Sequence, residues 1–442
     1  MTRARTSVGL DLRLRVASPE LLGLPWLEPL GEWDATSVAV QDIPVGPSRH
    51  LVRFVEADGQ LWALKELPQA TALTEYAVLR ELEHRSLSAV RAAGLVLQPS
   101  DGNAILVTHY LAGSWQYRRL LLRVPFTMRA HRSRLFDAIA TLLVDLHRHG
   151  FYWGDCSLNN TLFMRDGQAI HAWLVDAETA ELHPWLSDGQ RQLDLDIMIE
   201  NVLGGLLDVA ARLEVEEDVT EQLVAESEGV VSRYDELWAL LHEEPIIGLG
   251  DGDQVGARLR RLNDRGFAVE EVRLEAAGGA GEKVRLTTAV AGRTFHADEL
   301  QALTGLDVGE GQAAVLLKDL QSHRNRLRRE WGVDVPERVA ARLWLDEAFT
   351  PGAERAHRAV GGSGDRTQAY CDLLEVRWLL SEEAGADVGD ETTLRALARR
   401  AAPGESAATM AITEVATREL PVIRGTADGD DSPDETREDP KA

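Results

Sequence analysis

Residues 146–181 read L-H-R-H-G-F-Y-W-G-D-C-S-L-N-N-T-L-F-M-R-D-G-Q-A-I-H-A-W-L-V-D-A-E-T-A-E, and this stretch decides the predicted fold. The pattern predicts the end of an apolar helix, a tight loop that contains glycine, and two short apolar strands. Asp155, Asn160 and Asp176 fall at loop or strand-end positions. Side chains at such positions can converge on one point, so we expect these residues to form a site.

The spacing of these polar residues matches a known pattern of phosphoryl transfer. In that pattern a loop Asp accepts the hydroxyl proton, a following Asn binds Mg²⁺, and an Asp beyond a hairpin also binds Mg²⁺. Mg²⁺ prefers hard oxygen ligands and usually takes one or two carboxylates besides phosphate oxygens and water. The sequence therefore predicts Asp155 as the catalytic base, and Asn160 and Asp176 as metal ligands. Taken singly, each would be an ordinary turn residue.

Composition narrows the classes of partner. The 442 residues carry a formal net charge of −25, which argues against nucleic acid or an anionic membrane as the main partner. The two cysteines, Cys156 and Cys371, give no disulfide framework and suit a reducing compartment. No apolar run approaches the roughly 20 residues of a membrane span, and charges interrupt the N-terminal apolar residues. We expect a cytoplasmic protein.

The first part of the chain predicts a small β-rich lobe, residues 36–111, preceded by an extension, residues 1–35. The expected strands of this lobe are Ser37–Gln41, His50–Glu56 and Gln60–Glu66. The loop I-P-V-G-P-S-R-H would lie where kinases carry a glycine-rich cover over the phosphates, but it has one glycine, Gly46. Arg49 and backbone amides approaching a phosphate, and a plain hairpin loop, both remain open.

Lys65 ends the apolar strand L-W-A-L-K-E and is similar to the strand lysine that binds the α- and β-phosphates in kinases. A solvated lysine at a strand end is the alternative. The following segment has the apolar pattern of an amphipathic helix, and Glu75 near its start is expected to form an ion pair with Lys65. Glu81 is the second candidate, and an exposed i,i+4 charge is the alternative for both.

Residues 104–111, A-I-L-V-T-H-Y-L, predict an apolar strand that ends in a break. In a kinase fold this is the hinge, where backbone groups of His109, Tyr110 and Leu111 would bind adenine. A plain buried strand is equally consistent with the pattern.

The segment 112–245 is predicted to be mainly helical. The helix Ser133–Gly150 has one leucine-rich face and leads into the loop of Asp155. The later segment Q-L-D-L-D-I-M-I-E-N-V-L-G-G-L-L-D predicts a buried helix with acids at its start. Asp196 is the candidate for holding the backbone of the catalytic loop, a structural role. An acid that favours the helix dipole is the alternative.

The remainder predicts a linker, a second domain and a tail. P-I-I-G-L-G-D-G-D-Q lacks the spaced ligands of a calcium loop and is expected to be a linker. Residues 255–390 predict a smaller α+β domain. Its elements are a basic helix, a pair of strands, and helices at about 297–330, 336–348 and 366–385. Residues 403–442 are polar and acidic, and a disordered tail is expected.

Two resemblances follow from these motifs. W-G-D-C-S-L-N-N-T-L-F, with L-V-D-A-E downstream, resembles the signatures of lipopolysaccharide-kinase-like (Kdo/WaaP-like) and aminoglycoside-phosphotransferase-like atypical kinases. L-V-D-A-E-T-A-E-L-H-P, I-E-N-V-L-G-G-L-L-D and R-W-L-L-S-E-E-A-G-A-D-V-G resemble the bacterial domain-of-unknown-function 4032 (DUF4032) proteins. Those proteins join a kinase-like region to a C-terminal domain of unknown role, and the resemblance spans roughly residues 10–390.

The resemblance implies an α+β chain with a bilobal protein-kinase-like fold, a small β-rich N-lobe and a helical C-lobe, followed by the C-terminal domain. It also implies ATP and Mg²⁺ as cofactors. The chain departs from protein kinases at several positions. Trp153 and Gly154 precede Asp155 in place of His-Arg, Ser157 replaces the catalytic-loop lysine, and Glu178 ends a metal motif without its usual Phe-Gly. These changes point away from an ordinary Ser/Thr kinase.

Three hypotheses follow. The first is an ATP- and Mg²⁺-dependent phosphotransferase with an unidentified hydroxyl acceptor, and the second is a pseudokinase that serves as a nucleotide-binding or interaction scaffold. The third, a metal hydrolase that adds His147 and His149 to the two aspartates, is weak because residues at i,i+2 of a helix do not share a face. The C-terminal domain leaves room for a protein partner.

Overall fold

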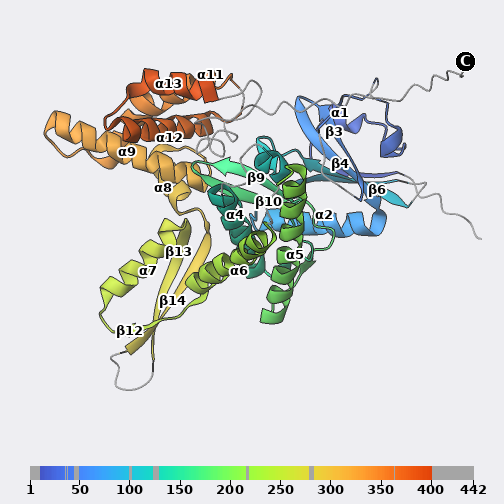
Figure 1. The fold of residues 1–442 in the computed structure, drawn as a ribbon, viewed down its shortest axis with the longest axis horizontal. Helices are drawn as coiled ribbons and strands as arrows, with labels where there is room; N and C mark the ends of the chain where they lie inside the picture. The colour runs from blue at the N-terminus through green and yellow to red at the C-terminus, as the bar shows by residue number, and fades with distance from the viewer. Residues whose placement is uncertain are drawn as a thin grey trace, which may run out of the picture.

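The computed structural model describes residues 10–400 apart from 35, 37, 44–48, 99–101, 123–128, 216–218, 278–282 and 363. Gly46 and the tail predicted to be disordered lie outside the described residues. The chain is a mixed α+β protein with a β-rich N-terminal region, as predicted (Figure 1). Among the described helices, none has both the length and the apolar character that crossing a membrane requires.

The N-terminal region is built on a six-stranded antiparallel sheet with the strand order β1-β5-β6-β4-β3-β2. The strands are β1 (Asp11–Leu14), β2 (Val40–Gln41), β3 (Leu51–Ala57), β4 (Gln60–Pro68), β5 (Ala92–Leu97) and β6 (Asn103–His109). Strands β3 and β4 form a hairpin whose turn residues, Asp58 and Gly59, have positive φ angles of 50° and 69°. This conformation matches the twist of the flanking strands and accounts for the predicted A-D-G turn.

The sheet buries both faces. Along β6, Ile105 and Val107 belong to an apolar cluster with the N-terminal segment that holds α1 (Pro19–Leu22) and η1 (Leu30–Glu32). Ala104 and Leu106 instead join the cluster that includes α2 (Gln69–His84). Successive side chains of a strand point to opposite faces, so this alternation places α2 on one face and the N-terminal segment on the other.

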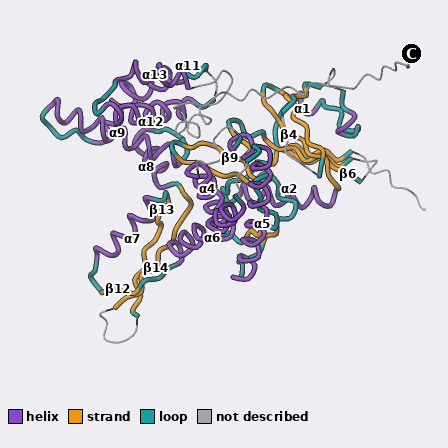
Figure 2. Tube along the Cα trace, in the orientation of Figure 1, coloured by secondary structure: helices purple, strands orange, loops and turns teal. Residues whose placement is uncertain are grey.

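A mainly helical region follows the sheet. Its helices are α3 (Tyr117–Leu121), α4 (Arg129–Arg148), α5 (Asp188–Arg212) and α6 (Thr220–His242). Its short strands are β7 (Ser114–Gln116), β8 (Phe151–Tyr152), β9 (Thr161–Asp166), β10 (Ala169–Leu174) and β11 (Glu181–Leu182). They form a sheet of order β10-β9-β7 and the pair β11-β8. Figure 2 shows this helical part between the N-terminal strands and the strands that follow α6 in the chain.

The C-terminal part begins with a further three-stranded sheet. Its elements are β12 (Ile246–Gly248), α7 (Gly252–Asp264), β13 (Phe267–Ala276) and β14 (Lys283–Arg293), with the strand order β12-β14-β13. The helices after it are α8 (Phe295–Thr304), α9 (Glu310–Trp331), α10 (Glu337–Trp344), the π-helical turn η2 (Leu345–Phe349), α11 (Thr350–Ala359), α12 (Arg366–Ala384) and α13 (Gly389–Arg400).

Two predictions for this part were wrong. The predicted linker contains β12, whose Ile247 pairs with Val284 of β14 and is buried, so it is an edge strand. The helix predicted over 297–330 is two helices, α8 and α9. The first ends at Gly305, whose φ of 79° is the left-handed conformation of a helix C-cap.

The tip of the β9–β10 hairpin is buried against the C-terminal helices. Asp166 accepts hydrogen bonds from the backbone amides of Gly311 and Gln312, both at 2.8 Å, in the first turn of α9. Gln368 of α12 accepts from the Gly167 amide at 2.8 Å and donates to its carbonyl at 2.9 Å. The Asp166 carboxylate lies at the N-terminus of α9, where a negative charge is favourable. The side-chain amide of Gln368 uses both its donor and its acceptor, so most polar groups of this contact are paired.

An ion pair joins the same surfaces. Arg165 lies 2.9 Å from Asp372 and also pairs with Glu375, and its Nε donates to the Gly167 carbonyl at 2.9 Å. Side-chain exposure is 4% for Arg165 and 1% for Asp372. A Cβ on Gly311 would lie 2.1 Å from the Asp166 carbonyl oxygen, so this approach of two backbones requires glycine.

Candidate active site

Lys65 of β4 is the centre of the candidate site. Its Nζ lies 2.8 Å from Oδ2 of Asp176, which follows β10, and 3.1 Å from Oε2 of Glu75 on α2. Glu178 is more distant, at 3.7 Å. The structure thus pairs Lys65 with Glu75, whereas Glu81 pairs with Arg85 four residues along the same helix. An alternating strand delivers Lys65 to the face of the sheet that α2 covers, which explains this contact.

Two carboxylates, those of Glu75 and Asp176, contact Lys65. Burial and the neighbouring charges shift the pKa values of Lys65 and Glu75. Burial acts to lower the pKa of Lys65, but the charges of Glu75 and Asp176 outweigh it and raise that pKa. Burial and the nearby Asp176 charge raise the pKa of Glu75 to about 7, against the opposing effect of Lys65. The cluster therefore has more negative charge than one lysine neutralises, and it would gain from a further cation.

Asp155 lies in the loop after β8 and is held by two amide side chains. Asn160 donates to its Oδ2 at 3.0 Å, and Asn201 of α5 donates to its Oδ1 at 3.1 Å. Burial raises the pKa of Asp155, while the Asn160 hydrogen bond and the Arg49 charge oppose that rise. The carboxylate is 31% exposed, so it is both fixed in direction and accessible to a reactant.

The loop backbone is held by Asp194, and the prediction of Asp196 was wrong. Asp194 is fully buried and accepts from the amides of Trp153 at 2.7 Å and Gly154 at 2.9 Å. His147 also contacts it, at 3.0 Å. Asp196 is exposed and accepts from Gln192, because it lies two residues further round α5 and faces away.

Asn160 and Asp176 lie on neighbouring segments at the open end of the hairpin. The Val175 amide donates to the Asn160 carbonyl at 3.0 Å, which places the residue before Asp176 beside Asn160. Asn160 uses its Nδ2 to donate to Asp155, so its Oδ1 is left to accept or to coordinate. One carboxylate and one amide oxygen form a donor set that suits Mg²⁺.

Glu178 lies among basic groups. His50 Nε2 lies 2.9 Å from its Oε2, and Arg49 lies 3.4 Å from its Oε1. The same guanidinium is 3.6 Å from Asp155. Arg49 therefore connects the loop of the predicted base with the segment of Asp176 and Glu178.

The predicted hinge has two of its three amides already engaged. The His109 amide donates to the Arg91 carbonyl at 2.9 Å, and the Tyr110 amide donates to the Leu61 carbonyl at 3.2 Å. Within the part of the chain that the structure describes, Leu111 is the one of these three residues whose amide remains available to donate a hydrogen bond to adenine.

The histidines of the metal-hydrolase hypothesis serve the fold. His147 is buried between Asp194 and the Tyr234 hydroxyl, which lies 2.9 Å from its Nδ1. His149, the residue after α4, contacts the Asp145 carbonyl of that helix. Across the described residues, no group of three or more His, Cys, Asp or Glu side chains has the arrangement of a metal site. The contacts of His147 and His149 are therefore with residues other than Asp155 and Asp176.

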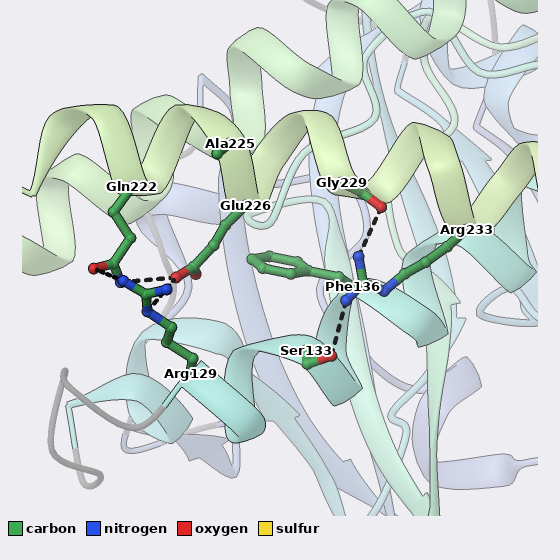
Figure 3. Close-up of a pocket in the computed structure, with 8 residues that line it drawn as sticks. All are labelled: Arg129, Ser133, Phe136, Gln222, Ala225, Glu226, Gly229 and Arg233. Carbon is green, nitrogen blue, oxygen red and sulfur yellow. Dashed lines mark hydrogen bonds and ion pairs between the residues drawn. The ribbon is translucent and has the colours of Figure 1, made fainter.

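An open cavity of about 500 Å³ lies elsewhere, between α4 and α6 (Figure 3). Its two arginines contact neighbouring protein groups. Arg129 donates to Gln222 at 2.7 Å, and Arg233 donates to Ser133 at 2.8 Å and to the Gly229 carbonyl at 2.7 Å. None of the residues that line it belongs to the site around Lys65. The cavity therefore has paired cations and no contact with the predicted catalytic residues.

Asn201 and Asp194 are site-supporting residues that the sequence analysis missed. They are seven residues apart on α5, which places them on one face two turns apart, and both bind the loop of Asp155. Polar side chains on the buried face of a helix are the signal that could have identified them.

Comparison with known proteins separates the chain into two parts. No curated protein matches it. One similar solved structure, described as WaaP in complex with acyl carrier protein, is 18% identical, covers 53% of this chain and 100% of its own, and gives a TM-score of 0.31. That score is too low to indicate a shared overall fold. Two family models match: residues 58–225 match the lipopolysaccharide kinase (Kdo/WaaP) family, and residues 236–401 match the domain of unknown function DUF4032.

Proposed function

We propose that the chain is an ATP- and Mg²⁺-dependent phosphotransferase of the atypical kinase type that acts on a hydroxyl acceptor. Residues 36–111 and 112–245 would form the two lobes of a protein-kinase-like unit, and residues 255–390 a C-terminal domain. The observation that carries the proposal is the contact of two carboxylates with one lysine. The Nζ of Lys65 lies within 3.1 Å of both Glu75 and Asp176. The match of residues 58–225 to a kinase family supports it independently.

The nucleotide would lie between the hinge and Lys65. The Leu111 amide would bind adenine, with carbonyl groups of His109 or Tyr110 as further partners. Lys65 would bind the α- and β-phosphates while Glu75 keeps its ammonium group in place. A buried lysine fixed by a glutamate is a preorganised cation, which stabilises phosphate charge more than a mobile lysine in water does.

Asn160 and Asp176 would hold the metal ion. When bound, Mg²⁺ supplies neutralisation of the phosphate charge and orientation of the transferred group. Asp176 would then be shared between the ion and Lys65, and its second oxygen is positioned by the Glu178 amide, which donates at 3.1 Å. Trp153 fixes the same segment, since its indole nitrogen donates to the Asp176 carbonyl at 3.0 Å.

Asp155 would act as the base. The acceptor oxygen forms a bond to the γ-phosphorus while the bond from that phosphorus to the bridging oxygen breaks. The acceptor proton goes to the Asp155 carboxylate, and ADP leaves with the electron pair. Asn160 and Asn201 direct the carboxylate, and its raised pKa makes it a better proton acceptor than an ordinary exposed aspartate.

A pseudokinase scaffold is the second candidate. The contacts of Glu178 with Lys65, His50 and Arg49 favour it, because cations suited to phosphates are already engaged by a carboxylate. The two candidates differ in turnover, and both can bind nucleotide.

A thermal-shift titration with ATP, with and without Mg²⁺, tests the nucleotide site in the wild type and in Asp176→Ala. Ligand at a hundredfold excess over Kd stabilises the folded state by about 2.7 kcal/mol. We expect a Mg²⁺-dependent rise in Tm in the wild type and its loss in the variant. No rise under any condition would contradict the nucleotide site, and an unchanged Mg²⁺-dependent rise in Asp176→Ala would contradict the metal assignment.

A further inference from the structure

The carboxylate of Glu178 contacts basic side chains from two other segments. Its Oε2 lies 2.9 Å from His50 Nε2 and 3.7 Å from Lys65 Nζ, and its Oε1 lies 3.4 Å from Arg49. The side chain is only 11% exposed. Imidazole, ammonium and guanidinium groups around one point are the donors that bind a phosphoryl group in proteins.

The position of this cluster matches where a terminal phosphate must lie in the proposed reaction. A transferred phosphoryl group has to be near both the lysine of the phosphates and the base. Glu178 is within 3.7 Å of Lys65, and Arg49 spans from Glu178 to Asp155 at 3.6 Å. A carboxylate and a phosphate are both anionic oxygen acceptors, so each can occupy the same set of donors.

We propose that Arg49 and His50, beside Lys65, form the subsite for the terminal phosphate of a nucleoside triphosphate, and that Glu178 is the counter-ion that occupies it in the nucleotide-free protein. This inference rests on the proposed nucleotide site and adds a binding role for Arg49 and His50. Binding of the triphosphate exchanges one anion for another, so Glu178 leaves the cations when the phosphate arrives.

The contacts of Glu178 favour a counter-ion over a metal ligand. Both of its oxygens face basic side chains, Oε1 toward Arg49 and Oε2 toward His50 and Lys65. Asp176, the proposed metal ligand, differs in that Oδ2 contacts Lys65 while Oδ1 accepts from the Glu178 amide. The two roles predict opposite effects of neutralising this residue, which makes them separable.

The test is isothermal titration of Mg²⁺ with ATP, Mg²⁺ with ADP, and sodium tripolyphosphate into the full chain and into Glu178→Gln. Removing the competing charge should tighten ATP and tripolyphosphate binding by about tenfold, since a like charge within a few ångströms of a phosphate costs at least that much. ADP binding should change less. Glu181→Gln removes the same charge three residues along, at an exposed position that pairs with His183, and should change none of them.

Arg49→Gln and His50→Gln complete the test. Each should reduce the preference for ATP over ADP by about tenfold while binding of ADP is retained. Weaker or unchanged ATP binding in Glu178→Gln would overturn the counter-ion role, and an unchanged ATP preference in both Arg49→Gln and His50→Gln would overturn the subsite.

The nucleotide proposal and the subsite can fail separately. If Glu178→Gln binds tripolyphosphate but no form of the protein binds ATP, the anion subsite stands and the nucleotide site is wrong. If neither ligand binds to any form, both are wrong.

Discussion

The two ends of the β9–β10 hairpin differ in the contacts and the exposure of their charged side chains. At the tip, Asp166 and Arg165 are buried, and their partners on α9 and α12 are amides and opposite charges within 2.9 Å. At the open end, Asp176 contacts Lys65, Glu178 contacts Lys65, Arg49 and His50, and the neighbouring Asp155 is 31% exposed.

The difference shows which polar groups of this chain stabilise the structure and which are available for binding. The polar groups of the tip are buried and bonded to α9 and α12, so they are not accessible to a ligand. The open end carries three carboxylates around Lys65, with the pKa of Glu75 raised to about 7. Unbalanced charge that is partly exposed is typical of a site that binds an ion or a charged substrate.

The largest expected effect is on stability, from Arg165→Met at the tip. The change leaves the buried Asp372 without its cation, and breaking a buried pair in this way costs about 3–5 kcal/mol in the free energy of unfolding. Urea denaturation measures the loss. Arg273→Met, which breaks an ion pair in which the arginine is 60% exposed, is the control and should cost less than about 1 kcal/mol. A small loss in Arg165→Met would contradict the view of the tip as a structural contact.

The same variant sharpens the comparison through a second measurement. At a temperature where Arg165→Met stays folded, its affinity for ATP with Mg²⁺ should equal that of the wild type. A loss of affinity would show that the tip contact controls the position of Asn160 and Asp176 at the other end.

The next effect is on turnover, from Asp155→Asn at the open end. Loss of the base should lower Mg²⁺-dependent ATP turnover, with water as acceptor, by at least about 10²-fold, while nucleotide binding remains. The amide oxygen can keep one of the two hydrogen bonds from Asn160 and Asn201, so stability should fall by about 1 kcal/mol. Asp196→Asn, on the exposed face of α5, is the matched control and should leave turnover unchanged. Wild-type turnover in Asp155→Asn would remove the assignment of the base.

The smallest effect concerns pH, through Glu75. Because its folded-state pKa is raised to about 7 by burial and by Asp176, the folded protein binds a proton more tightly than the unfolded chain does. Stability from this group is therefore present below the unfolded pKa near 4.5 and is lost as pH rises toward about 7. In metal-free protein, Glu75→Gln should flatten this decline by about 1–3 kcal/mol across the window. Equal pH slopes in both proteins would contradict the raised pKa.

The sequence predicted the fold where local patterns are strong. The alternating strand that carries Lys65, the apolar helix α4 and the two strands after Asp155 each carry a periodicity that is also present in the structure. It did not predict β12, because a three-residue edge strand depends on the partner β14 and leaves almost no periodicity of its own.

The candidate site was predicted from spacing, and its supports were not. Asn201, Asp194 and His50 act through contacts that span 40 to 128 residues of sequence, as in Gly154 with Asp194 and His50 with Glu178. Spacing within one segment cannot place such partners, since only the packed fold brings their segments together. The incorrect prediction of Asp196 in place of Asp194 is an example. A shift of two residues along a helix changes the face on which an acid lies.

The position of α6 has a practical consequence for anyone who produces parts of this protein. The kinase-family match ends at residue 225 and the DUF4032 match begins at residue 236, yet both positions lie within the single helix Thr220–His242. Leu237 and Leu240, inside the second match, are buried in the same apolar cluster as α4. An expression fragment cut at either border would end inside a helix and expose that cluster, so the two matched regions are better produced as one polypeptide.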